Sequence, residues 1–293
     1  DTSANIATNL DALQTNQAKI TSITQSLPAS SMTLTGTQYA NDQAALGKIT
    51  GGYTATVNNV TAANAASVAG NSSVTALTVR DTAANIAANI DALQTHHAKI
   101  TSTTQTDAGT PLAITGTQVT NDADALADIT PNTYTVQASG TFSASDAITL
   151  ITANSHVAVT ISDTAANIVS NLADLVTNRA QITSITQSNA GALNVSYAQA
   201  TDANTITTLN KINSGTYTLN VSGVSAGNVS SLAANTKVTS MLVTDTSANI
   251  ATNLNDLQTN QAKITSITQS GTPAALDVTY SQVTSAAQAL AKI

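Results

Sequence analysis

The chain has 293 residues, of which 42% are hydrophobic and only 9% charged, and its formal net charge is −7. Its nine Lys and Arg residues form no basic stripe that could neutralise a phosphate backbone, which excludes nucleic acid as an expected partner. No apolar run reaches the ~18 residues of a membrane-spanning helix. The absence of Cys excludes disulfides and thiolate metal sites, and the lack of Trp leaves Ile, Leu, Val and Ala to build the core.

The sequence repeats itself with a period of 80 to 82 residues. Four segments of 26 residues align without gaps, and the first and last of them differ at only two positions. Such near-identity indicates duplicated units in equivalent surroundings, rather than one unique chemical site. We therefore divide the chain into repeats 1–80, 81–162 and 163–244, followed by a partial repeat 245–293.

The first part of each repeat predicts a strand followed by a helix. In the third repeat, the alternating run 157–162 leads into Asp163, whose carboxylate suits a helix N-cap. Ile168, Leu172 and Leu175 follow at i, i+4 and i+7, which predicts an amphipathic helix that lasts to about Arg179. The equivalent aspartates are accordingly predicted to be structural caps of the repeats: Asp1, Asp81, Asp163 and Asp245.

The rest of each repeat predicts two more strand-to-helix steps. In the third repeat, strands at 182–188 and 192–198, joined by a Gly-containing turn, precede a helix that begins near Thr201 or Asp202. A strand at 216–222 precedes a short helix near 228–234, and a last strand at 238–244 leads to Asp245. This alternation favours a parallel sheet covered by helices, because each right-handed crossover returns the chain beside the strand it left.

The expected fold class is therefore α/β. We expect a solenoid-like tandem array of strand–helix units with a parallel sheet, because such crossovers can continue without closing. The alternative is a string of separate small α/β domains of ~80 residues each. No Pro-rich or Gly/Ser-rich linker separates the repeats, which favours continuous stacking.

One catalytic motif matches the sequence, the G-x-S-x-G string at 223–227, which follows a predicted strand and precedes a predicted helix. A hydrolase of that type needs a His after the Ser in the chain, but His96, His97 and His156 all precede Ser225. Ser225 is better interpreted as a helix N-cap. We expect no enzymatic activity and no catalytic residue.

The candidate metal ligands are few. His96 and His97 stand at the end of a polar helix and are expected to be solvated. An acidic cluster at Asp122, Asp124 and Asp128 is not kept in the third repeat, where the corresponding residues 202 to 212 contain only Asp202. No calcium-binding loop motif is present. We expect no cofactor and no metal site, with calcium at a few sites between repeats as the alternative.

Paired asparagines recur one helical turn apart in every repeat. A functional interpretation is a polar ladder that binds a sugar or a neighbouring chain, and a structural one is that the amides satisfy backbone groups; we favour the second. The pairs are Asn5 with Asn9, Asn85 with Asn89, Asn167 with Asn171, and Asn249 with Asn253.

The DTAANI..NL.AL…KITSIT pattern, the Thr/Ala/Asn/Ser bias, the lack of Cys and the acidic balance together resemble repeat regions of very large secreted bacterial surface proteins. These include type I-secreted adhesins and S-layer-like proteins. The resemblance implies an extracellular location at the bacterial cell surface and a structural role. The expected function is a self-assembling segment of a surface layer, sheath or filament, with other copies or adjacent repeats as partners and a surface glycan as a further candidate. The alternative is an inert adhesin stalk that presents a distal binding domain.

Overall fold

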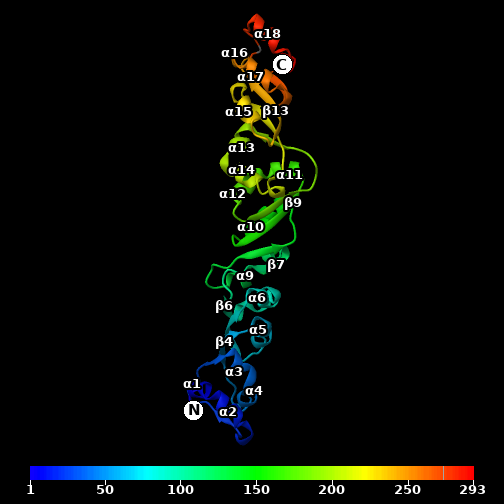
Figure 1. Cartoon of the computed structure of the whole chain (residues 1–293). Helices are drawn as coiled ribbons and strands as arrows, with labels where there is room; N and C mark the ends of the chain where they lie inside the picture. Colours follow the sequence, from blue (N-terminus) through cyan, green and yellow to red (C-terminus); the bar gives the residue numbers. More distant parts are fainter. Residues whose placement is uncertain (273) are drawn as a thin grey trace. The chain divides into compact units, whose positions relative to one another are not determined.

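The computed structural model describes residues 1–272 and 274–293, and the chain divides into two compact units. Unit 1 comprises Asp1–Gly140 with Leu150–Ala158, and unit 2 comprises Thr141–Thr149 with Val159–Ile293. Figure 1 shows the order of helices and strands along the chain, from blue at the N-terminus to red at the C-terminus. Helix α10 (Ala144–Ala153) and strand β9 (Val157–Asp163) contribute residues to both units.

Short elements follow one another in both units. The other elements of unit 1 are α1 (Ser3–Thr8), α2 (Leu10–Thr15), η1 (Gln17–Lys19), β1 (Ile23–Thr24), β2 (Met32–Thr35), α3 (Gly36–Asn41), α4 (Gln43–Leu46), β3 (Ile49–Thr50), β4 (Ala55–Val60), α5 (Ala62–Ala69), β5 (Val74–Asp81), α6 (Ala83–Ala88), α7 (Ile90–His96), η2 (His97–Lys99), β6 (Ile100–Gln105), β7 (Leu112–Thr115), α8 (Gly116–Asn121), α9 (Ala123–Ala127) and β8 (Val136–Ser139). The other elements of unit 2 are α11 (Ala165–Ser170), α12 (Leu172–Thr177), β10 (Ile182–Gln187), β11 (Leu193–Ser196), α13 (Tyr197–Thr201), α14 (Ala203–Leu209), η3 (Asn213–Gly215), β12 (Leu219–Val224), η4 (Ala226–Asn228), α15 (Val229–Ala233), β13 (Val238–Asp245), α16 (Ser247–Thr252), α17 (Leu254–Thr259), η5 (Gln261–Lys263), β14 (Ile264–Gln269), α18 (Tyr280–Ser285) and α19 (Ala287–Leu290).

Every strand pair among the described residues is parallel. In unit 1, β2, β4, β5 and β6 form one sheet, β1 pairs with β3, and β8 lies between β7 and the first two residues of β9. In unit 2, β9 from Val159 onward pairs with β10, and β11 to β14 form a sheet in chain order. The predicted α/β class with parallel sheets is confirmed.

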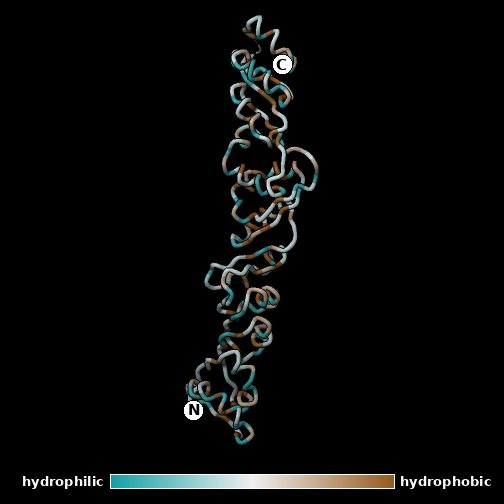
Figure 2. Tube along the Cα trace, in the orientation of Figure 1, coloured by the Kyte–Doolittle hydropathy of each residue, from teal (hydrophilic) through white to brown (hydrophobic). Residues whose placement is uncertain are grey.

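The core is made of aliphatic rows that cross the strands in register. Along each strand the side chains alternate between buried and exposed, so one face of each sheet supplies the core. Figure 2 shows hydrophobic and hydrophilic residues interspersed along the whole chain trace. One row in unit 1 joins Leu34, Val57, Leu77 and Ile100, and one in unit 2 joins Val195, Val221, Met241 and Ile264.

The long helix predicted at the start of each repeat is wrong in one respect, because it is two short helices. In the third repeat α11 ends and α12 begins at Asn171, whose backbone takes φ −99° and ψ 8°. The side-chain amide of Asn171 donates to the Asn167 carbonyl oxygen at 2.8 Å. An asparagine that competes for backbone groups in this way favours a break in the helix. The same break recurs at Asn9, Asn89 and Asn253.

The second helix predicted in the third repeat is α14, which begins at Ala203 after its N-cap Asp202, as predicted, but an additional short helix, α13, precedes it. Ser196 and Gln199 form a capping box, in which each side chain bonds the other residue's backbone N–H. The capping box ends β11 at Ser196 and starts α13 at Tyr197, where the sequence pattern predicted continued strand. Asp202 then separates α13 from α14 and caps α14 by accepting from the Thr205 backbone N–H at 2.7 Å.

In the described part of the chain, no helix is both long and apolar enough to cross a lipid bilayer.

Candidate functional site

The four repeat aspartates were predicted to be helix N-caps, but each of them lies one residue before the N-cap. The N-cap of the helix is the following threonine, whose hydroxyl oxygen accepts from the backbone N–H of the asparagine three residues later at 3.2–3.4 Å. These N-caps are Thr2, Thr82, Thr164 and Thr246. The aspartate side chain is therefore available to accept other hydrogen bonds. We call the aspartate, the threonine and the asparagine four residues after the aspartate the repeat joint.

Each joint aspartate from the second repeat onward ties together the starts of two helices. Oδ1 of Asp81 accepts from the Thr82 backbone N–H at 2.9 Å and from the Asn85 amide at 2.6 Å. Oδ2 of the same side chain accepts from the backbone N–H of Ala62, the first residue of α5, at 2.9 Å. In this way one carboxylate links α5 to α6 across 19 residues of chain. The first turn of a helix has free N–H groups and a positive partial charge, so it suits a carboxylate.

The same geometry recurs in the later repeats. Asp163 accepts from the backbone N–H of Ala144, and Asp245 from that of Ala226, both at 2.9 Å. Their Oδ1 atoms accept from the next threonine N–H at 2.8 Å and from the joint asparagine at 2.7 Å. Asp1 makes the equivalent Oδ1 contacts, at 2.7 and 2.8 Å.

These contacts favour the ionised form of the three joint aspartates from the second repeat onward. Burial raises the pKa of Asp81, but hydrogen bonds from Asn85 and from the Ala62 and Thr82 backbone outweigh it, so that the pKa lies below its ordinary value. The pKa values of Asp163 and Asp245 are lowered by the same balance of causes. The joint is therefore a charged contact that holds best above the ordinary carboxyl pKa.

The paired asparagines have local partners. The first of each pair donates to its joint aspartate, and the second donates to the carbonyl oxygen of the first, at 2.8–2.9 Å. This geometry fits the structural interpretation of the pairs. A sugar-binding role for them stays a prediction.

Two further sets of repeated contacts were not predicted from the sequence. Oε1 of Gln14, Gln94 and Gln258 accepts from the backbone N–H of Ala45, Ala125 and Ala289, at 2.8, 2.9 and 3.0 Å. Each bond joins one helix to the next strand–helix step, about 31 residues on. The third repeat has Val176 at this position, and there Asp202 caps α14 instead. The recurrence of Gln at this position in three of the four repeats is the feature of the sequence that could have predicted these bonds.

Lysine side chains donate hydrogen bonds at the C-terminal ends of two helices. Lys99 Nζ donates to the carbonyl oxygens of Ala69 and Asn71, at 2.6 and 3.0 Å, just past the end of α5. Lys263 makes the same contacts after α15, with Ala233 and Asn235 at 2.7 and 3.1 Å. A cation at a helix C-terminus satisfies free carbonyls and complements the dipole.

The G-x-S-x-G string has a conformational explanation. Gly223 has φ +69° within a register shift of β12, and Asn59 has φ +55° in the equivalent shift of β4. The Ser225 hydroxyl oxygen accepts from the Asn228 amide at 2.8 Å, while the next backbone N–H, that of Ala226, bonds Asp245. Ser225 is the N-cap residue of η4, as predicted, although its hydroxyl does not itself bond the backbone of that turn.

The residues considered as candidate metal ligands do not come together in one site. The Nε2 atom of His97 lies 3.7 Å from Oδ2 of Asp124, and both side chains are largely exposed to solvent. Among the described residues, no group of three His, Asp or Glu side chains is arranged to hold a metal ion. Burial raises the pKa of Asp128, and the nearby charge of Asp124 adds to this while His97 opposes it. His97, Asp124 and Asp128 therefore form an electrostatic cluster within repeat 2.

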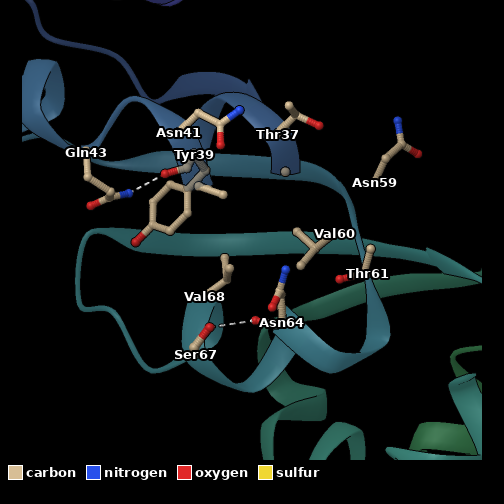
Figure 3. A pocket seen from close by; sticks show the side chains of 12 residues that line it. Thr37, Tyr39, Asn41, Gln43, Asn59, Val60, Thr61, Asn64, Ser67 and Val68 are labelled. Carbon is tan, nitrogen blue, oxygen red and sulfur yellow. Dashed lines mark hydrogen bonds between the residues drawn. The ribbon is translucent and has the colours of Figure 1, made fainter. Parts of the chain in front are cut away.

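A hollow of about 440 Å³ lies between α3, α5 and the register shift of β4 (Figure 3). Figure 3 shows Tyr39 of α3 and Val68 of α5 on facing sides of the hollow, and Asn41, Asn59 and Asn64 also belong to its lining. Tyr39 is the only titratable residue of its lining, and burial raises the pKa of that phenol. The lining offers neutral hydrogen-bonding groups and no nucleophile paired with a base.

The comparisons with known proteins place the chain in no family. No protein-family model matches it, and no match was found among curated proteins or among solved structures.

Proposed function

We propose that this chain is a segment of an extracellular structural scaffold, a tandem-repeat part of a bacterial surface layer, sheath or filament that self-assembles. We further propose that its repeats stack as a continuous β/α solenoid. The protein then acts through repeated contacts rather than through a reactive centre, and it is not an enzyme. Its partners in this proposal are further copies of the chain or adjacent repeats.

The observation that carries the proposal is the recurrence of the repeat joint. Asp81, Asp163 and Asp245 each join the helix of one strand–helix step to that of the next, with distances that agree to about 0.1 Å. A contact that recurs with the same partners supports a role in propagating a structure along the chain. The parallel pairing of strands about 20–30 residues apart supports the same interpretation.

The alternative function is an inert stalk that holds a distal binding domain. The two functions differ in lateral contacts, because assembly needs them and a stalk does not. Static light scattering of the intact chain over a concentration series tests this difference. The proposal predicts ordered association at high concentration, and a strict monomer throughout, with and without calcium, would favour the stalk.

The enzymatic alternative is tested through Ser225. An esterase assay of the intact chain is expected to show no turnover above that of the Ser225→Ala variant. A rate that falls on this substitution would contradict the structural proposal.

A further inference from the structure

Three aspartates in unit 1, Asp42, Asp122 and the half-buried Asp128, have a buried carboxylate oxygen without a hydrogen-bond partner, and two of these residues are themselves buried. Asp42 and Asp122 are 3% and 4% exposed, and the Oδ2 atom of each is buried and accepts no hydrogen bond. They occupy equivalent places, at the junction of α3 with α4 and of α8 with α9. An unpartnered buried carboxylate is costly, so each of these oxygens needs a ligand.

A second carboxyl comes from the helix packed against each junction, because α2 packs against α4 and α7 packs against α9, and Asp91 and Asp122 line the same hollow. Asp11 on α2 is within hydrogen-bonding reach of Asp42, and Asp91 on α7 is within reach of Asp122. Asp91 also accepts from the Gln118 amide at 3.1 Å, which orients it. Across the described residues, the only ion pair is that of His97 with Asp124, so no basic side chain neutralises either buried aspartate.

We propose that the Asp11–Asp42 pair and the Asp91–Asp122 pair each hold one proton from solvent, shared in a carboxyl–carboxylate hydrogen bond. The proton supplies the donor that the buried oxygen lacks. The shared bond ties α2 to α4 and α7 to α9. When the proton leaves, two negative charges face each other and these two helix contacts loosen. The two pairs thus make unit 1 sensitive to pH.

The electrostatics agree with this geometry. Burial, followed by the hydrogen bond and charge of Asp11, raises the pKa of Asp42 to about 6. Burial and Asp91 raise the pKa of Asp122 to the same value. Two carboxyls that close do not ionise independently, so the value belongs to the pair.

The other titratable groups of the surrounding elements do not replace the proton. Around Asp42 they are Tyr39 on α3, Lys19 in η1 and Lys48 after α4, and none of them contributes to the shift of Asp42. Around Asp122 they are Asp124 and Asp128 at α9 and, on α7 and η2, His96, His97 and Lys99, and none contributes to the shift of Asp122.

The last two repeats lack the pair. In the fourth repeat, Asn255 and the buried Ala286 stand at the places of Asp11 and Asp42. In the third, Ala173 stands at the first place, and two extra residues put Thr205 at the second, four residues before the core leucine Leu209. Both partners are replaced together in each case, and unit 2 serves as an internal control.

The direct test is a titration of the aspartate side-chain carboxyl carbons by NMR in the intact chain. The expected result is two carboxyl signals in unit 1 with apparent pKa values of about 6. Asp42→Asn should remove one of them and Asp122→Asn the other. Should these substitutions perturb folding, Asp11→Asn, which copies Asn255 at an exposed site, should lower the pKa of Asp42 instead. Titration of every aspartate near or below 4, or unchanged titrations in these variants, would overturn the proposal.

Hydrogen exchange of the same intact protein gives the structural readout. After correction for the intrinsic exchange rate, we expect exchange in peptides from α2, α4, α7 and α9 to become faster by up to roughly 100-fold between pH 4 and pH 7. A pKa shift of about two units corresponds to a change of this size in an equilibrium constant. Peptides from α12, α14, α17 and α19 should not change. Equal behaviour of both sets would contradict the proposal. Restoration of protection by calcium chloride at pH 7 would also overturn it, by showing that a metal ion fills the place of the proton.

Discussion

The first two repeats and the last two share the repeat joint but differ in how the following helices meet. In repeats 1 and 2 an exposed and a buried aspartate face each other, whereas repeat 4 has Asn255 and Ala286 at the same places. One neighbouring contact is the same in these repeats, since Gln14, Gln94 and Gln258 all accept from a backbone N–H of the next helix. One scaffold therefore accommodates either a titratable contact or a neutral one. Response to pH can be set independently of the fold.

The two kinds of aspartate also respond to pH in opposite directions. The joint aspartates Asp81, Asp163 and Asp245 have lowered pKa values, so their contribution to stability is present above the ordinary carboxyl pKa and is lost as pH falls through the folded value. The paired aspartates have raised pKa values, so their contribution is present below the ordinary value and is lost as pH rises through about 6. We expect unit 1 to be most stable near pH 4, between the two losses.

The largest effect should come from a joint that both regions share. Asp163→Ala removes the acceptor of the Ala144 and Thr164 backbone N–H groups and of the Asn167 amide, and its side chain is only 8% exposed. Loss of a carboxylate that satisfies buried donors should lower the free energy of unfolding by about 3 kcal/mol at pH 7. Urea unfolding measures this as a lower midpoint. The exposed Asp256→Ala is the control, and a similar loss in both variants would contradict the joint.

The difference between the two regions can be tested by introducing an aspartate pair into repeat 4, which lacks one. Asn255→Asp together with Ala286→Asp should lower stability by about 2 kcal/mol at pH 7, and by clearly less at pH 4, where the new pair holds a proton. Urea midpoints at the two pH values measure the difference. The single variant Asn255→Asp is the control, because it adds an exposed carboxyl and creates no pair. A loss that is the same at both pH values would show that the effect is steric.

The converse change should remove the pH response of unit 1. Asp42→Asn with Asp122→Asn replaces the shared proton by amide hydrogens, which can donate to Asp11 and Asp91 at any pH. Stability at pH 7 should rise by about 1–2 kcal/mol for each pair, and the decline expected between pH 4 and 6 should disappear. Thermal melts across this range measure both effects. Persistence of the decline in the double variant would place its origin elsewhere.

The smallest effect concerns the glutamine contacts. Gln94→Ala leaves the Ala125 backbone N–H without its acceptor and should cost about 1 kcal/mol. Gln258→Ala should cost about the same, because the bond to Ala289 is equivalent. The exposed Ser281→Ala serves as the neutral control in urea unfolding. A larger loss for Gln94→Ala would show that the second bond of Gln94, from its amide to the Asp124 carboxylate, is worth more than the bond of Gln258 to Gln288.

Much of the fold follows from periodicity in the sequence. The strand-to-helix steps of the third repeat, including the short helix near 228–234, are present, because alternation of buried residues marks the strands and turn residues separate them. Element boundaries were less predictable. The breaks at Asn9 and its equivalents, and the additional helix α13 that begins at Tyr197, depend on side chain-to-backbone bonds that hydrophobic spacing does not record.

The residues of the candidate site could be predicted from the sequence, but the contacts between them could not. Recurrence singled out the joint aspartates and asparagines, yet the contact of Asp81 with Ala62 joins residues in different steps of the chain. The acid pairs were harder still to predict, because Asp11 and Asp42 lie 31 positions apart in the sequence. In addition, the third repeat contains two extra residues, so a gap is needed to align its Thr205 with Asp122. Tertiary contact, rather than local pattern, brings each pair together.

In the proposed solenoid, the repeats stabilise one another through the repeat joints and the aliphatic rows. Urea unfolding of fragments 1–80, 1–162 and 1–244 measures this stabilisation, because in a stacked array each added repeat contributes a new interface. Midpoints and m values should therefore rise with repeat number. Three fragments that unfold at the same midpoint would contradict the proposed solenoid and would identify the repeats as independent domains.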